Sequence, residues 1–364
     1  MRYALILVVL FAATTANAQW EIQTAPTTAD LRGIDNVGKG IVWASGSDGT
    51  VLRTTDDGAH WQLCPTPPGA EKLDFRGIQA FDEKTAIVMS TGKGPLSRLY
   101  KTTDACQSWK LLFTNPDPEG SWAAFTVDEK YWDKEKPGLI ILGNPISGQF
   151  VMWWSENGEN DWKRWQTRPS TVGEVVFAAS NTGLANDSDD GIRFFGTGGP
   201  QGARLFTECE PCTTRQFEKD GIFVQPMSMF AKGRSVGIFS IAFKYQRAVL
   251  HVVAVGGDSL KPNEHGDAAY SDWIHWHAAA TPPHGFRSAV AYDAATKTWI
   301  TVGPNGTDIS TDDGRNWRAL RPNSALHEPE DADRDWNALS LPFVVGPHGR
   351  IGRLRPAALK AGKP

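Results

Sequence analysis

SGSDGTVLRTTDDGAHW, residues 45–61, decides the fold of this chain, because it returns near the C-terminal end as TVGPNGTDISTDDGRNW, residues 301–317. Each copy is a strand-like segment that runs into the pattern Ser/Thr-x-Asp-x-Gly-x-x-Trp. A unit that recurs at a distance is the signature of a repeat architecture, in which each repeat is one supersecondary unit. We therefore expect the same unit elsewhere in the chain.

The repeated unit has four short parts, bounded by Gly, Pro, Asp or Asn as β-strands are. An opening strand precedes a strand that ends in Gly, then a Gly-rich hairpin with a third strand, then a last strand led by Trp. Units of about 49 residues fill the chain, a length typical of propeller blades. The sequence predicts an all-β fold, a seven-bladed β-propeller of four-stranded blades. The opening strands are LRGIDNV (31–37), FRGIQAFD (75–82), SWAAFTVD (121–128), GEVVFAAS (173–180), FSIAFKY (239–245), FRSAVAYD (286–293) and DWNALSLP (335–342).

The two ends of the chain complement each other. After GRIGRLRP, residues 349–356, the seventh unit has no fourth strand of its own. WEIQTAP, residues 20–26, looks like the Trp-led last strand of the other units. We expect this N-terminal strand to close the last blade, which would leave no unpaired strand edge there.

The Ser/Thr-x-Asp-x-Gly-x-x-Trp pattern is interpreted as the Asp-box, or BNR repeat. In such a turn Asp accepts backbone N–H groups, Gly supplies a positive φ, and Trp packs between blades. In the second copy Cys106 stands where the other copies have Gly. We interpret the motif as structural and remote from any ligand. Its residues are Asp56, Gly58 and Trp61, then Asp104 and Trp109, then Asp312, Gly314 and Trp317.

Together these segments resemble the photosystem II assembly and stability factor-like family, within the YVTN/BNR-like propeller superfamily. The resemblance covers nearly all of the chain after residue 18. Runs such as FRGIQAFDEKTAIVMSTG, AVGGDSLKPNE and FRSAVAYD match the non-photosynthetic bacterial branch. The resemblance implies the propeller fold and, from the photosynthetic members, a role in assembling membrane complexes. Some other members carry an oxidoreductase label.

The N-terminus MRYALILVVLFAATTANAQW is typical of a secretory signal peptide, with Arg2 before an apolar run and a small-x-small site ending at Ala18. The apolar run is too short to span a membrane, and no other long apolar segment follows. We expect residues 1–18 to be removed, a single propeller domain over residues 19–364, and a periplasmic or secreted location. A net charge of −4 argues against a global basic field for nucleic acid.

The four cysteines are Cys64, Cys106, Cys209 and Cys212, and export would permit disulfides. Cys209-Glu-Pro-Cys212 could close a small loop as a disulfide, or remain as two thiols. A structural metal site would need a second Cys or His pair at matching spacing, and the sequence shows none. We therefore predict neither a metal nor a cofactor.

Candidate binding residues come from the face where the opening strands begin and the second-to-third hairpins turn. Aligning the opening strands places one residue of each blade at the channel mouth, and three of these are Arg. Clustered arginines offer fork-shaped donors to carboxylate, phosphate or sulfate. The alternative is that they pair with acidic neighbours and join the blades. The ring residues are Arg32, Arg76, Trp122, Glu174, Ser240, Arg287 and Asn337, and the hairpins add Asn144, Asp258 and Lys261.

These features favour an exported, non-enzymatic binding or assembly scaffold that holds a protein partner or a small anionic ligand at the Arg-lined face. One alternative is a sialidase-type glycoside hydrolase, in which the arginines would clamp a sugar carboxylate. No Tyr aligns with the channel mouth to serve as its nucleophile. The other alternative is an oxidoreductase, for which the sequence holds no dinucleotide fingerprint and no haem motif.

Overall fold

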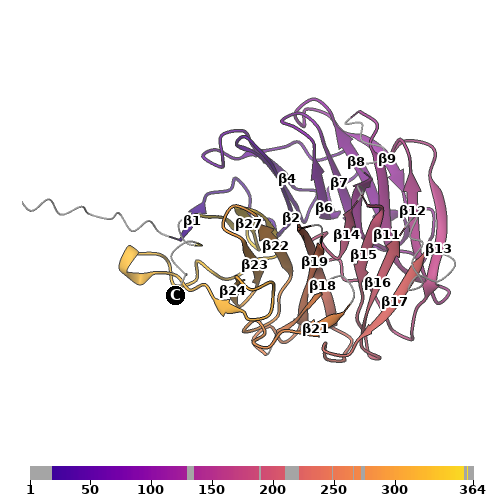
Figure 1. Ribbon diagram of the computed structural model, residues 1–364. Helices are drawn as coiled ribbons and strands as arrows, with labels where there is room; N and C mark the ends of the chain where they lie inside the picture. The colour runs from indigo at the N-terminus through magenta and orange to yellow at the C-terminus, as the bar shows by residue number, and fades with distance from the viewer. Residues whose placement is uncertain are drawn as a thin grey trace, which may run out of the picture.

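The computed structural model describes residues 19–128, 135–187, 190–209, 221–247, 249–264, 266–271, 275–355 and 359. This part of the chain forms seven four-stranded antiparallel sheets arranged in a ring (Figure 1). The fold is therefore a seven-bladed all-β propeller, which confirms the prediction from the repeats. The first strand of each blade contacts the first strands of its neighbours, so these strands line the central channel.

The first three blades follow the predicted units closely. Blade one consists of β2 (Leu31–Gly38), β3 (Ile41–Gly46), β4 (Val51–Thr54) and β5 (Gln62–Leu63). Blade two consists of β6 (Asp74–Ala80), β7 (Ala86–Thr91), β8 (Arg98–Thr102) and β9 (Lys110–Thr114). Blade three consists of β10 (Trp122–Asp128), β11 (Gly138–Ile146), β12 (Gln149–Ser155) and β13 (Lys163–Pro169).

The remaining blades complete the ring. Blade four consists of β14 (Leu184–Asp187), β15 (Ile192–Gly196), β16 (Ala203–Cys209) and β17 (Ile222–Met227). Blade five consists of β18 (Val236–Gln246), β19 (Val249–Asp258), β20 (Asp267–Ser271) and β21 (Trp276–Ala278). Blade six consists of β22 (Ala289–Asp293), β23 (Thr298–Gly303), β24 (Gly306–Ser310) and β25 (Arg318–Ala319). Blade seven combines β26 (Ala338–Ser340), β27 (Phe343–Val345) and β28 (Ile351–Leu354) with β1 (Trp20–Gln23).

The second strand of a blade is apolar on both faces because each sheet is packed between two neighbouring sheets. All six residues of β23 are buried, and so are the first five of β7. Strands buried on both faces read as continuous hydrophobic runs rather than as alternating ones. This is why TWITVG and AIVMST show no polar side for solvent.

The ring closes through the N-terminal strand, as the sequence predicts. β1 pairs antiparallel with β28, from Trp20 opposite Leu354 to Gln23 opposite Ile351. The Trp20 ring stacks on Trp336 of the same blade, with centroids 5.9 Å apart. The first and the last strand that the structure describes therefore lie in one sheet.

Blade four departs from the prediction. The segment 173–180 is not its opening strand. The opening strand is β14, which begins at Leu184, four residues after that segment ends. Residues 174–183, here called the channel segment, bond to the inner strands of other blades. Phe125 N in blade three donates to Asn181 Oδ1, and Ile241 N in blade five donates to the Thr182 carbonyl. The apolar run GEVVFAAS reads as a strand locally, but its backbone bonds to side chains of other blades, since Val176 N donates to Asn144 Oδ1 and the Ala178 carbonyl accepts from Arg76 Nη1.

Each of the three copies of the Asp motif forms the same hydrogen-bonded turn in its own blade. In blade six, Ser310 Oγ donates to Asp312 Oδ1 at 2.8 Å, and Gly314 N donates to Ser310 Oγ at 3.1 Å. Asn316 then donates its backbone N–H to Asp312 Oδ1 and its amide to Oδ2, at 2.9 and 2.8 Å. Gly314 needs its φ of +82°, a conformation that side chains disfavour. The same turn is built from Thr54 and Asp56 in blade one and from Thr102 and Asp104 in blade two.

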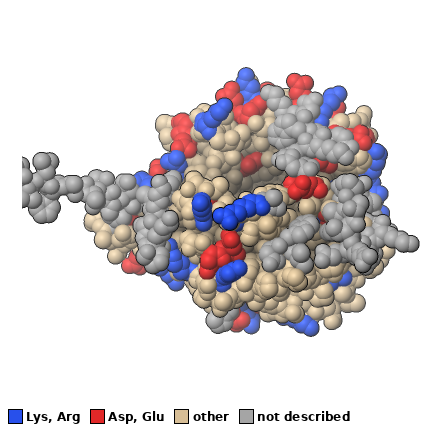
Figure 2. Space-filling model, viewed as in Figure 1, with Lys and Arg blue, Asp and Glu red and all other residues tan. Residues whose placement is uncertain are grey.

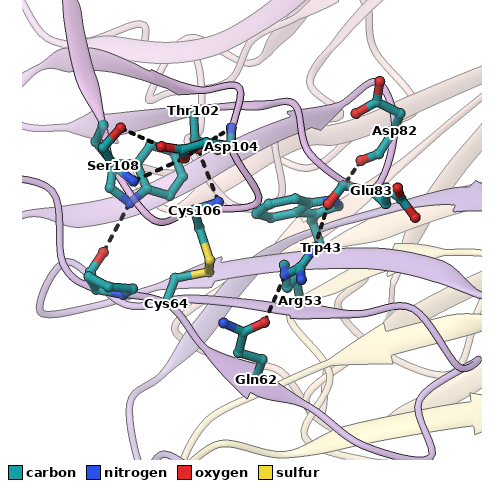
Figure 3. The surroundings of a disulfide bond; sticks show 12 residues. Trp43, Arg53, Gln62, Cys64, Asp82, Glu83, Thr102, Asp104, Cys106 and Ser108 are labelled. Atoms are coloured by element: carbon teal, nitrogen blue, oxygen red, sulfur yellow. Dashed lines mark hydrogen bonds between the residues drawn. A yellow bond between two sulfur atoms is a disulfide. The ribbon is translucent and has the colours of Figure 1, made fainter.

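Each motif turn also bonds to the blade before it, which the sequence did not suggest. Asp57 forms an ion pair with Arg353 of blade seven, and Asp313 forms one with Lys244 of blade five. Blade two has Ala105 at this position, so it lacks the carboxylate. There Cys106, in place of the motif Gly, forms a disulfide with Cys64 of blade one (Figure 3). A covalent bond thus joins blades one and two at the turn where blades one and six use charge.

The motif tryptophans pack as predicted, between neighbouring blades. Trp61 lies edge-on to Phe343 of blade seven, with centroids 6.3 Å apart. Trp317 packs in one cluster with Val253 and Val255 of blade five. Trp109 donates its indole N–H to the Pro65 carbonyl at the end of blade one. The motif therefore shapes a turn and covers a blade seam at once.

The cysteine prediction was incomplete. Cys64 and Cys106 were not expected to pair, yet they form a disulfide across a sequence separation of 42 residues. Cys209 is also disulfide-bonded. Its predicted partner Cys212 lies outside the described residues, as does the predicted signal peptide.

Replacing the motif Asp should destabilise the fold. In Asp312→Ala the donors of Ser310 and Asn316 lose their acceptor, and because Asn316 is exposed to water we expect the free energy of unfolding to fall by about 1 kcal/mol. Urea unfolding followed by tryptophan fluorescence measures this. Glu330→Ala, at an exposed position of the connection between blades six and seven, is the control and should unfold like the wild type. A midpoint for Asp312→Ala equal to that of the control would contradict the structural role of the turn.

Breaking the Cys64–Cys106 disulfide should cost more. Closing a loop of this length stabilises a folded chain by about 2–4 kcal/mol. We expect Cys64→Ser/Cys106→Ser to unfold at a lower urea concentration than the wild type. The two urea midpoints should become equal when the disulfide of the wild type has been reduced by unfolding in excess reductant and both proteins are measured in that reductant. Equal midpoints under oxidising conditions would show that the seam between blades one and two does not depend on the disulfide.

Candidate functional site

The candidate residues lie on one side of the ring, here called the hairpin face. It carries the hairpins between second and third strands and the starts of the first strands. On the side of the molecule in view in Figure 2, acidic and basic side chains are intermingled, with no large area of one sign. On the side in view, a charged partner would meet small local clusters rather than one large area of a single sign.

Arg32 and Arg76 lie side by side because both bind Asp74. Arg76 Nε donates to Asp74 Oδ2 at 2.8 Å, and Arg32 Nε lies 3.2 Å from Asp74 Oδ1. Asp30 adds a carboxylate 3.5 Å from Arg32 Nη2. The arginine side chains are 26% and 28% exposed, so part of each guanidinium faces solvent. Two of the three predicted arginines therefore meet across the seam between blades one and two.

The sequence prediction missed Asp74, although a local signal was present. Residues i and i+2 of a β-strand point to the same face of the sheet. Asp74 begins β6 two residues before Arg76, so the two side chains had to share a side of blade two. Each arginine is paired with a carboxylate, as the alternative interpretation predicted, and each keeps part of its surface open. Ligand binding by these arginines stays a prediction.

The channel segment crosses the space between the inner strands just behind this pair. Arg76 Nη1 donates to the Ala178 carbonyl at 2.7 Å, from blade two to the segment that leads into blade four. Ser180 Oγ donates to the Ser288 carbonyl of blade six at 2.8 Å. The hydroxyls of Thr182 and Ser240 of blade five lie 2.7 Å apart. The channel segment therefore bonds to blades two, three, five and six and crosses the channel that their inner strands line.

Arg287 does not face the channel mouth, contrary to the alignment of the opening strands. Its side chain is fully buried, with its Nε 2.9 Å from Asp308 Oδ2. Its remaining N–H groups donate to Asn305 and to the Phe286 carbonyl, and one lies 2.9 Å from His284 Nδ1. A guanidinium with every donor engaged cannot also hold a ligand. Arg287 instead anchors the loops between blades five and six.

Glu174 and Asn144 also serve the channel segment rather than an open site. Glu174 is buried and accepts hydrogen bonds from Arg204, Thr197 and Thr171. Burial opposes its ionisation, but these donors outweigh it and lower the pKa of Glu174 below its usual value. Asn144 Oδ1 accepts the Val176 N–H at 2.8 Å. Both residues fix the start of the channel segment at blades three and four.

Asp258 and Lys261 do line an open cavity, as expected of hairpin residues. The pocket has a volume of about 590 Å³ and lies beside the β19–β20 hairpin of blade five. Lys261 forms an ion pair with Glu264 at 3.1 Å, and Asp258 accepts the Leu260 N–H at 3.0 Å. His284, which the sequence did not single out, also lines the pocket and rests on Asp308 at 2.9 Å. The pocket walls therefore carry charges of both signs.

Asp35 lies in the same seam as Arg32 and Arg76, further along β2. Its Oδ2 accepts the Ala80 N–H at 2.7 Å and the Gln79 amide at 3.0 Å, both from β6. Burial without a cationic partner raises the pKa of Asp35 to about 6, and the Ala80 hydrogen bond only partly offsets this. The seam that positions the two arginines thus contains a carboxyl that titrates in the mildly acidic range.

Within the described ranges, no group of three or more His, Cys, Asp or Glu is placed to hold a metal ion. In the same part of the chain, no helix is long and apolar enough to cross a membrane.

No protein-family model matches the chain, and no curated protein matches it. Among solved structures it is similar to YCF48 bound to D1 peptide, with a TM-score of 0.59, 16% identity, and coverage of 92% of this chain and 96% of that chain. It is similar to YCF48 from Cyanidioschyzon merolae, with a TM-score of 0.60, 17% identity, and coverage of 93% and 99%. It is also similar to a GH74 xyloglucanase from Xanthomonas campestris, with a TM-score of 0.53, 14% identity, and coverage of 88% of this chain and 56% of that chain. At these identities the likeness shows the propeller fold, and the bacterial branch stays a prediction.

The titration of Asp35 should appear in the pH dependence of stability. The folded protein holds a proton between about pH 4 and pH 6 that the unfolded chain has released, so this group makes the wild type less stable as pH rises. Asp35→Asn stays neutral, so its melting temperature should exceed that of the wild type at pH 7.5 and approach it below pH 5. A constant gap from pH 4.5 to 7.5 would contradict this assignment. Glu330→Gln is the matched surface control.

Proposed function

We propose that this protein is an exported, non-enzymatic scaffold that binds an acidic protein partner on its hairpin face, with Arg32 and Arg76 as contact residues. The observation that carries the proposal is the Arg32–Asp74–Arg76 cluster at the mouth of a closed ring. Asp74 bridges the two guanidinium groups, Asp30 also contacts Arg32, and both arginines keep part of their surface open. Fixed, partly exposed arginines are suited to planar, two-point contact with carboxylates.

The rigidity of the ring supports a binding role. A scaffold that does not rearrange loses little entropy when a partner docks, so modest local contacts suffice for affinity. The channel segment favours a partner that stays on the surface, because it occupies the space below the mouth. The solved YCF48 structure bound to D1 peptide supports peptide or protein binding by a propeller of this fold.

Direct binding to an acidic peptide tests the proposal. The probe is a fluorescein-labelled octaglutamate peptide, followed by anisotropy at low and physiological salt, with octalysine as the control probe. We expect the wild type to bind octaglutamate, and Arg32→Gln/Arg76→Gln to bind it at least about tenfold more weakly. The melting temperature of the variant should change little, since partly exposed ion pairs contribute about 1 kcal/mol or less.

Arg315→Gln, which removes a guanidinium near the blade-six motif turn, is the control and should bind like the wild type. No binding of octaglutamate by the wild type, or equal binding by Arg32→Gln/Arg76→Gln, would refute the proposal. Severe unfolding of the double variant would assign the arginines to blade pairing. A melting-temperature screen with sugars and nicotinamide cofactors addresses the hydrolase and oxidoreductase alternatives, because a ligand that binds only the folded state raises this temperature.

A further inference from the structure

A second cluster of two arginines around one aspartate lies on the hairpin face, outside the residues considered so far. Arg321 follows the last strand of blade six, and Asp333 and Arg334 precede the first strand of blade seven. Arg321 Nη1 is 3.6 Å from Asp333 Oδ2, and Arg334 Nε is 3.7 Å from Asp333 Oδ1. The arrangement parallels that of Arg32, Asp74 and Arg76. That first cluster lies between blades one and two, and the second lies between blades six and seven.

The aspartate of this cluster is buried and has no hydrogen-bond donor. Its side chain is 0% exposed, and neither carboxyl oxygen has a hydrogen-bond partner among the described residues. A separation of 3.6 Å is too long for a hydrogen bond. Burial raises the pKa of Asp333, while the charges of Arg321 and Arg334 oppose the rise. Asp333 therefore attracts the two guanidinium groups by charge without using their N–H donors.

The two arginines consequently keep their donors free. Their side chains are 52% and 50% exposed, and within the described part of the chain neither guanidinium group donates a hydrogen bond. Arg287 is the opposite case, buried with all its donors engaged. Arg321 and Arg334 also face one carboxylate between them, whereas Arg32 and Arg76 face both Asp74 and Asp30. The second cluster thus has two arginines to one carboxylate, whereas the first has two arginines to two carboxylates.

The blade-seven hairpin, residues 346–350, joins the two clusters across the hairpin face. Arg350 forms an ion pair of 3.2 Å with Asp331, two residues before Asp333. At the other end of the hairpin, His348 N donates to Asp30 Oδ1 at 3.1 Å, and Asp30 contacts Arg32. A partner lying along blade seven would meet one arginine pair at each side of this hairpin.

We propose that Arg321 and Arg334 form a second oxyanion-binding subsite, which takes a carboxylate of the same acidic partner that contacts Arg32 and Arg76. The inference rests on the proposed function, since it names a further contact of that partner. The geometry suits a carboxylate because planar guanidinium groups with free N–H pairs bind it through two parallel hydrogen bonds. Two subsites on one rigid face make binding of a chain with several carboxylates tighter than either subsite does alone.

Octaglutamate anisotropy with paired variants tests the subsite. Arg321→Gln/Arg334→Gln should weaken binding about tenfold, and combining it with Arg32→Gln/Arg76→Gln should weaken binding about a hundredfold, as independent sites add. Monoglutamate should compete weakly against octaglutamate, because it occupies one subsite at a time. Inorganic phosphate is the second competitor. Displacement of octaglutamate by phosphate at concentrations where acetate has no effect would overturn the choice of carboxylate as ligand.

Two outcomes separate this inference from the proposed function. Loss of binding in Arg32→Gln/Arg76→Gln with no change in Arg321→Gln/Arg334→Gln would overturn the second subsite alone. Absence of octaglutamate binding by the wild type would overturn the proposed function itself. Asp333→Asn tests the subsite if Arg321→Gln/Arg334→Gln does not fold. It removes the opposing charge beneath both arginines, so it should bind octaglutamate several-fold more tightly, and unchanged or weaker binding would count against the subsite.

Discussion

Everything on the hairpin face depends on the pairing of β1 with β28. The ladder from Trp20 to Gln23 closes a sheet that the C-terminal part of the chain leaves one strand short. The stack of Trp20 on Trp336 and the 2.6 Å hydrogen bond from Trp20 N to the buried Glu328 extend this contact beyond the ladder. Because a closed ring has no free sheet end, each blade is held by two neighbours. The spacing of side chains on different blades is then a property of the fold.

The motif turns add a second level of constraint at the blade seams. Their internal hydrogen bonds are nearly identical in three blades, and each turn also reaches back to the preceding blade. The chemistry of that link is interchangeable: a carboxylate meets Arg353 or Lys244 in two cases, and a disulfide replaces it in the third. What is kept is the position of the link, because the turn emerges at the same point of each blade. In the structure the repeated stretch thus forms a turn and a link between blades, on the side of the ring opposite the hairpins.

The arginines show how far local sequence can be read as function. Arg32, Arg76 and Arg287 align in similar sequence segments, yet Arg287 lies two residues before β22 and is buried, and only the first two are partly open. Asp308, contributed by β24, takes Arg287 out of solvent, and nothing in the segment FRSAVAYD indicates this. Conversely, Arg321 and Arg334 lie in the connection between blades six and seven, where no repeat can be aligned, so no sequence pattern indicates that they lie together. Charged residues acquire their roles from the carboxylates that the fold brings beside them.

The sequence by itself determined the number of blades, the strand composition and the closing strand, because these follow from periodic patterns of apolar residues and turns within each repeat. It also predicted the packing of the motif tryptophans. Only the tertiary structure decided that residues 174–183 cross the channel, that Cys106 pairs with Cys64, and which arginines stay open. The physical reason is that the repeat pattern specifies contacts inside a blade. Contacts between blades join residues far apart in the chain, whose partners no local pattern records.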